Sequence, residues 1–141
     1  MSEVEFDPER LPRYTVILQP YKFQSGYAEP KRFVVLGHVE GHAFCVKATS
    51  QVEVYVQSKE RMAGCVFYAA GELPFFEAPT AIQPDNQFAI PHESILRALD
   101  HGAFRVIGQM PADFHDKFIH AVKNSVTISP RESKRLLDFL K

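Results

Sequence analysis

The residues best suited to chemistry lie at the two ends of one stretch, Lys31 to Ser50. Lys31 and Arg32 open this stretch, and the hydroxyl pair Thr49 and Ser50 closes it. A guanidinium beside a hydroxyl can bind a phosphate group, because both donate hydrogen bonds to its oxygens. The same combination is also common on plain protein surface. The stretch therefore suggests an anion site, without identifying the anion.

Two apolar runs inside this stretch must position those residues. Phe33–Leu36 and Phe44–Val46 flank a turn rich in Gly and His. Such runs on either side of a Gly-containing turn predict two paired strands. If they pair, Arg32 and Thr49 lie near each other at one end of the ladder. His38 and His42 are candidates for acid–base work, since histidine as a residue type ordinarily titrates near neutral pH. We expect them at the opposite end of the hairpin from Arg32, and plain surface histidines are the commoner alternative.

A long loop is predicted at residues 20–30, after a first strand at 13–19, because it holds two Pro and one Gly. Loops of this length in a compact domain are often functional. Its aromatic residues, Tyr21, Phe23 and Tyr27, can stack on nucleic-acid bases. The alternative is that they cover the open end of a barrel, since aromatic side chains are more commonly buried.

Length and composition indicate one folded domain. The chain has 141 residues, of which 45% are hydrophobic and 23% charged, as is typical of a globular protein. Residues 1–12 form an acidic arm and residues 13–141 a single domain. The net charge of −1 provides no general attraction to nucleic acid.

Compartment and cofactors follow from what the sequence lacks. No apolar run approaches the roughly 18 residues that span a membrane, and the N-terminus has no hydrophobic signal segment, so we expect a cytoplasmic protein. Cys45 and Cys65 lie in strand-like runs and are expected to be reduced, with a disulfide as the less favoured alternative. Because neither the Cys nor the His spacing suits a metal, no metal or cofactor is expected.

The rest of the chain predicts further strands followed by helices. Strands are expected at 51–57, 64–70 (a central strand), 86–91 and 103–109, with a charged turn at 58–64. The loop 71–85 carries Phe75 and Phe76, as either a core plug or an exposed interface patch. Helices are expected at 93–100 and 111–124, and a third begins at the capping box Ser129-Pro130-Arg131-Glu132. This order favours an α+β protein, a partly closed β-barrel with added helices.

The order of elements and two motifs resemble the MazF/PemK family of bacterial toxins. The run from Lys31 to Leu36 is similar to the family's strand of basic-Arg-Pro-Ala-Val-Val-Leu, with Phe33 in place of Pro. The run from Phe44 to Ser50 looks like the strand that ends in the family's hydroxyl pair. Residues 88–95 resemble the following strand-to-helix segment, whereas Arg13-Tyr14 replaces the family's Gly-Asp.

The resemblance implies an SH3-like barrel of the MazF/PemK/CcdB type and a homodimer. It also implies a metal-independent endoribonuclease that cuts single-stranded RNA and is neutralised by an antitoxin protein. Such cleavage uses the 2′-hydroxyl as nucleophile and needs a base, an acid and a cation. The alternative is a non-catalytic SH3-like barrel module that binds a protein or nucleic acid.

The same resemblance suggests roles for particular residues. Arg32 would stabilise the phosphate charge, Thr49 and Ser50 would hydrogen-bond its oxygens, and Glu29 would act as general base by its position. The residues expected to bind the RNA are the cation and two aromatic residues nearest the site, Lys31, Tyr27 and Phe23.

Overall fold

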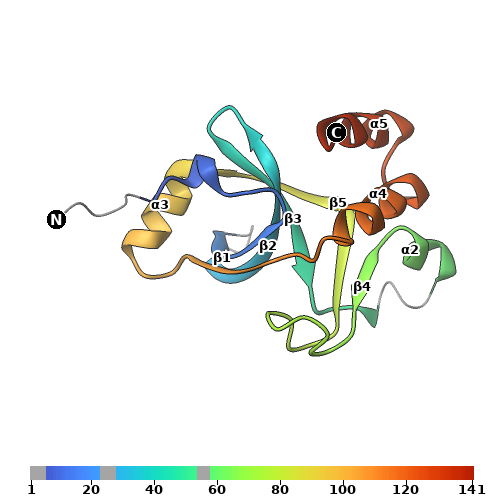
Figure 1. Ribbon diagram of the computed structural model, residues 1–141, viewed down its shortest axis with the longest axis horizontal. Coiled ribbons are helices and arrows are strands. Elements are labelled where there is room, and N and C mark those ends of the chain that lie inside the picture. The colour runs from blue at the N-terminus through green and yellow to red at the C-terminus, as the bar shows by residue number, and fades with distance from the viewer. Residues whose placement is uncertain (1–5, 23–27, 54–57) are drawn as a thin grey trace.

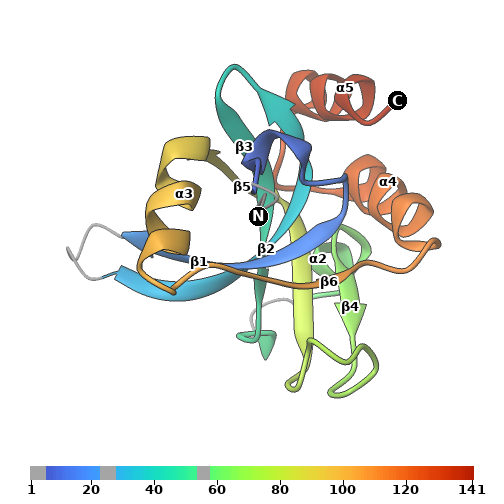
Figure 2. The same cartoon turned by 60° about the vertical axis from the view of Figure 1, so that its left-hand side comes forward.

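The computed structural model describes residues 6–22, 28–53 and 58–141, which form an α+β protein (Figures 1 and 2). Six antiparallel strands make one sheet, in the order β4-β5-β3-β2-β1-β6, that curls into a half-barrel. The strands are β1 (Thr15–Lys22), β2 (Ala28–Val39), β3 (His42–Thr49), β4 (Val66–Tyr68), β5 (Thr80–Pro91) and β6 (Arg105–Gln109). The helices are the 3-10 helix η1 (Pro8–Arg10), α2 (Lys59–Ala63), α3 (His92–Asp100), α4 (Phe114–Asn124) and α5 (Pro130–Phe139).

The predicted pair of strands is present as β2 and β3. Their ladder runs from Arg32 opposite Ala48 to Val39 opposite His42. The turn between them uses Gly41 at φ 81°, a backbone conformation that glycine adopts without a Cβ penalty. The hairpin therefore places the two basic residues and the two histidines at opposite ends, as expected.

The sheet buries both of its faces, which explains the unbroken apolar runs in β2 and β3. Val34 and Val46 face each other in the ladder and join a core completed by α4 and α5. Phe33 and Cys45 enter a second core, to which α3 contributes Ile95 and Ala98. In Figure 1, α3 accordingly lies at one side of the sheet, with α4 and α5 at the other.

The first strand does not stop at Pro20, contrary to the prediction. β1 continues to Lys22, and Pro20 lies opposite Pro30 of β2. On its other side, β1 pairs with β6 only as far as Leu18. Pro20 thus occupies an edge-like position of β1, where a missing backbone N–H costs little.

The middle of the chain differs most from the predictions. Residues 59–63 form α2, which begins at the N-cap Ser58, rather than a turn. Residues 51–53 are outside any strand, and 54–57 lie outside the described residues. β4 is an edge strand and not a central one, because it lies at the end of the sheet and pairs with β5, while Val66 and Tyr68 are buried in the core that includes α4. β5 begins at Thr80, six residues earlier than expected.

Several side chains settle alternatives that the sequence left open. Phe76 is buried, and Phe75 packs on the backbone of Gly108, so this pair plugs the core instead of forming a patch. Cys45 and Cys65 are both free thiols. No helix among the described residues has the length and apolar character needed to cross a membrane.

The two ends of the described chain are held to the sheet. Residues 6–12, which we expected to be part of an acidic arm, contain η1 and the buried Leu11, and the ring centroids of Phe6 and Phe104 are 5.3 Å apart. The C-terminal α5 begins as predicted, with the Ser129 hydroxyl accepting from the Glu132 amide at 3.1 Å.

Candidate functional site

Arg32 and Thr49 lie at the same end of the β2–β3 ladder but on opposite faces. Arg32 is directly opposite Ala48, so the alternation of side chains along β3 turns Thr49 to the other face. The two side chains can meet only around the end of β3, which finishes at Thr49. Arg32 and Thr49 therefore lie at one end of the ladder, as expected, but their side chains are not adjacent on one face.

Arg32 and Thr49 can each donate further hydrogen bonds. Arg32 is exposed, and no described residue forms an ion pair or hydrogen bond with its guanidinium. The Thr49 hydroxyl accepts a bond of 3.2 Å from the amide of Gln51, which leaves its O–H free to donate. Ser50, just beyond β3, is exposed. This end of the hairpin therefore presents donors, as an anion requires.

A row of polar residues crosses three strands on the face that includes Thr49. Gln19 of β1 lies opposite Lys31 of β2. Lys47 of β3 lies opposite Phe33 of β2, and therefore on the same face as Lys31 and Thr49. Lys31, Lys47 and Thr49 are half-buried. We call these four polar residues, Gln19, Lys31, Lys47 and Thr49, the polar row.

Three aromatic rings adjoin the polar row. Tyr21 and Phe88 meet edge to face with ring centroids 4.8 Å apart, and Phe33 lies 5.5 Å from Phe88 and 6.0 Å from Tyr21. Tyr21 and Phe88 are each half-buried, whereas Phe33 is fully buried. Two cations, a hydroxyl and two partly accessible rings thus share one face, a combination suited to a phosphate backbone and its bases.

Gln19 contributes an unusual acceptor to this face. Its side chain is almost fully buried, and its Nε2 donates to the carbonyl of Ser94 at 3.4 Å. Its Oε1 is buried, and no residue in the described part of the chain donates a hydrogen bond to it. Such an orphaned acceptor carries an energetic cost of about 1–3 kcal/mol, and it marks the side of the row that α3 covers.

Some of the expected site residues cannot be placed. Phe23 and Tyr27 lie outside the described residues. For Glu29 only the backbone is described, and it lies opposite Tyr21 in the β1–β2 ladder. Tyr21 itself belongs to β1, not to a loop, so a part of the predicted loop is strand.

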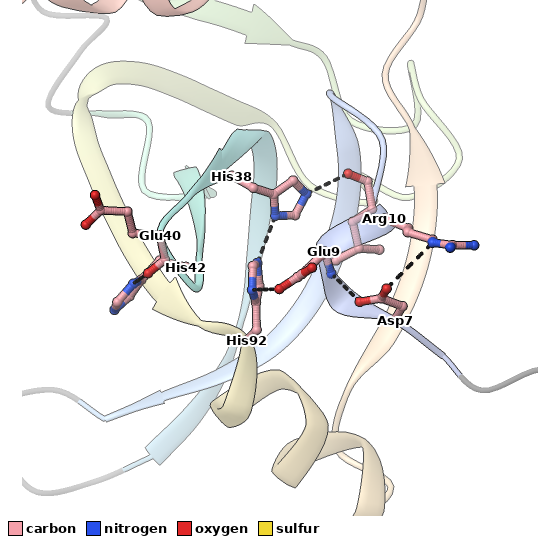
Figure 3. A network of polar contacts seen from close by, with 8 residues as sticks. Asp7, Glu9, Arg10, His38, Glu40, His42 and His92 are labelled. Atoms are coloured by element: carbon pink, nitrogen blue, oxygen red, sulfur yellow. Dashed lines mark hydrogen bonds and ion pairs between the residues drawn. The ribbon is translucent and has the colours of Figure 1, made fainter.

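The histidines of the hairpin do not join this site. His38 bonds to His92 at the far end of β2 (Figure 3), and His42 Nδ1 lies 3.0 Å from the carbonyl of Glu40. No group of three or more His, Cys, Asp or Glu side chains among the described residues is arranged to hold a metal.

Sequence reasoning missed Lys47 and Gln19 as members of the row. Both lie within runs that read as ordinary strands, and their shared face depends on the register of three strands. The alternation of Lys47 with Cys45 and Thr49 was a signal that could have found Lys47.

Comparisons with family models, curated proteins and solved structures find no match for this chain.

Proposed function

We propose that the chain is a MazF/PemK-like protein with an SH3-like barrel, whose β1–β3 face binds single-stranded RNA and cleaves it without a metal. The observation that supports RNA binding is the polar row beside the rings of Tyr21 and Phe88. Lysines neutralise phosphates in a sequence-independent way, and aromatic rings stack on any base. A homodimer and an antitoxin partner belong to the same proposal and rest on the family resemblance alone.

For the cleavage step, the reactive phosphate would lie at the end of β3. The exposed Arg32 guanidinium would reach around this end to the phosphate that Thr49 and Ser50 hydrogen-bond. Glu29 would take the proton of the 2′-hydroxyl, whose oxygen would bond to the phosphorus as the P–O5′ bond breaks, and the leaving 5′-oxygen would take a proton from solvent. An arginine can provide two parallel hydrogen bonds to phosphate oxygens, which lysine cannot. The cation matters most in the transition state, where the phosphate carries the most charge.

A second candidate is an RNA-binding module that does not cleave. The opposite faces of Arg32 and Thr49 favour this candidate, because a charged group that does not converge with its partner cannot stabilise a transition state efficiently. The binding surface would be the same, and only the chemical step would be missing.

The test is single-turnover cleavage of a mixed-sequence RNA in the presence of EDTA, together with RNA binding under the same conditions. Arg32→Ala should lower the cleavage rate at least about a hundredfold and weaken binding much less, because only transition-state interactions change the chemical step. Lys134→Ala, which removes one exposed charge from α5, is the control. Binding without cleavage by the wild-type chain would support the second candidate, and neither activity would refute both.

A further inference from the structure

A pair of histidines connects the N-terminal segment to the β2–β3 hairpin and to α3 (Figure 3). His38 Nε2 lies 2.9 Å from the carbonyl oxygen of Leu11, and His38 Nδ1 lies 2.9 Å from His92 Nε2. The two rings are 5.0 Å apart, and only 8% of the His92 surface is exposed. The contact is thus an internal one between three separate parts of the chain.

Hydrogen-bond chemistry fixes where the protons of this pair reside. A carbonyl oxygen only accepts, so His38 Nε2 must carry a hydrogen and donate it to Leu11. In the neutral ring, His38 Nδ1 is then an acceptor, and His92 Nε2 must be the donor to it. The remaining nitrogen, His92 Nδ1, is therefore left as a bare lone pair.

Among the residues that the structure describes, none hydrogen-bonds to His92 Nδ1, which is buried. The nearest charged group across from it is the Glu9 carboxylate, whose Oε1 is 3.9 Å away. His92 Nδ1 is the buried acceptor of this pair, whereas the Glu9 side chain is 69% exposed, and a proton on Nδ1 would give the two groups opposite charges. A metal has too few ligands here, since no third suitable side chain joins them among the described residues.

A second proton on the histidine pair would have no acceptor to face. If both rings were charged, His38 Nδ1–H and His92 Nε2–H would point at each other across 2.9 Å. Charged groups around His92 act in both directions. Glu9 of η1 and Asp7, the N-cap of η1, favour a charged His92, while His42 of β3 disfavours it. His92 is also the first residue of α3, whose positive N-terminal end disfavours a cation.

We propose that His38 and His92 form a one-proton site that keeps residues 6–12 docked at neutral pH and releases them when acid forces a second proton onto the pair. The first proton is held on His92 Nδ1 against Glu9 and leaves the bond from His38 to Leu11 intact. The second must break either the His–His bond or the bond to Leu11. The site therefore acts as an acid-sensitive latch on the N-terminal segment.

The sign of the pH dependence follows from proton counting. The folded pair accepts one proton where the unfolded chain accepts two, so acid favours the undocked segment. Burial and the neighbouring His38 lower the pKa of His92 below its ordinary value of 6.5. Docking is thus fully stabilised above about pH 6.5 and weakens as the pH falls below it.

The experiment is an NMR titration of the intact chain from pH 8 to pH 4 that follows both imidazole rings and the amides of residues 6–12. One proton should bind while the Leu11 amide signal keeps its docked position, and loss of that position should accompany the second proton. Glu9→Gln should move the first step to lower pH by about half a unit, because a partly exposed carboxylate no longer faces His92.

Glu93→Gln is the matched control, because it removes an equal charge one residue from His92, where the carboxylate pairs with Arg97 instead. It should move the first step much less than Glu9→Gln does. Equal shifts in the two variants would contradict the site, as would two protons binding while residues 6–12 stay docked. His38→Asn provides a second check: the segment should then lose its coupling to pH, and unchanged acid release would also overturn the proposal.

Discussion

The Arg13 guanidinium donates a hydrogen bond of 2.9 Å to the carbonyl oxygen of Leu140, 127 residues away in the chain. It also donates to the carbonyls of Phe139 and Leu36, at 3.2 and 2.9 Å. The last carbonyls of a helix lack partners within the helix, and a cation also suits the negative end of its dipole. Arg13 therefore connects the C-terminal end of α5 to Leu36 of β2.

Replacing Arg13 should loosen this attachment. Arg13→Lys keeps the charge but cannot reach three carbonyls at once, so we expect a loss of about 1–3 kcal/mol in the free energy of unfolding. Urea denaturation measures this loss, and Arg10→Lys on the exposed side of η1 serves as the control. A variant as stable as the wild type would show that α5 is held by its apolar face alone.

Gly108 is predicted to be intolerant of a side chain, since a Cβ at this position would overlap the ring of Phe75. Gly108→Ala should lower the free energy of unfolding by about 1–3 kcal/mol, as overpacking does. In a Phe75→Ala background the same change should cost much less, because the obstructing ring is gone. Denaturation of the single and double variants measures the coupling, and additive effects would contradict the contact.

Burial should make Cys45 unreactive at moderately alkaline pH. Burial raises the pKa of the Cys45 thiol to about 12 and that of the Cys65 thiol to about 11. Both raised values exceed that of an unfolded thiol, so the protonated form stabilises the fold, and this stabilisation is lost as the pH rises above about 9. Labelling with a thiol reagent at pH 8 should be slow for Cys45 in the native chain and fast in urea. Rapid native labelling of Cys45 would contradict its burial.

The sequence predicts local features better than distant ones. The capping box at Ser129 is correct because it depends on residues that are neighbours in the chain. The turn predicted at Gly37 to His42 is correct in place but shorter, because β2 continues to Val39 and β3 begins at His42. The edge position of β4 was missed because β4 packs against α4, more than 40 residues later. α2 buries no residue, and its N-cap Ser58 was a local signal that the sequence analysis missed. The prediction that Pro20 ends the first strand was wrong, because the cost of its missing backbone N–H depends on whether a neighbouring strand pairs with that side of β1.

For the candidate site too, the sequence predicted the features that depend on neighbouring residues and missed those that depend on strand register. The hairpin and its basic end follow from the two apolar runs and the turn between them, so Arg32 and Thr49 were correctly assigned to one end. Their opposite faces follow from the register, in which Arg32 lies opposite Ala48, one residue short of Thr49. A shift of one residue reverses every side chain of a strand, and nothing in the local sequence specifies that register. Lys47 joins the site for the same reason.

The most direct test of the central claim is the binding of a labelled single-stranded RNA to the wild-type chain and to Lys47→Ala, by fluorescence anisotropy at fixed salt. Lys47 lies in the polar row, whereas Lys134 lies on α5 and is exposed. Removing a phosphate contact should weaken binding about three- to tenfold and make the dependence of affinity on salt less steep by about one contact. Lys134→Ala should leave both quantities unchanged. Equal affinities for the two variants, or no binding by the wild-type chain, would contradict the proposal that the β1–β3 face binds RNA.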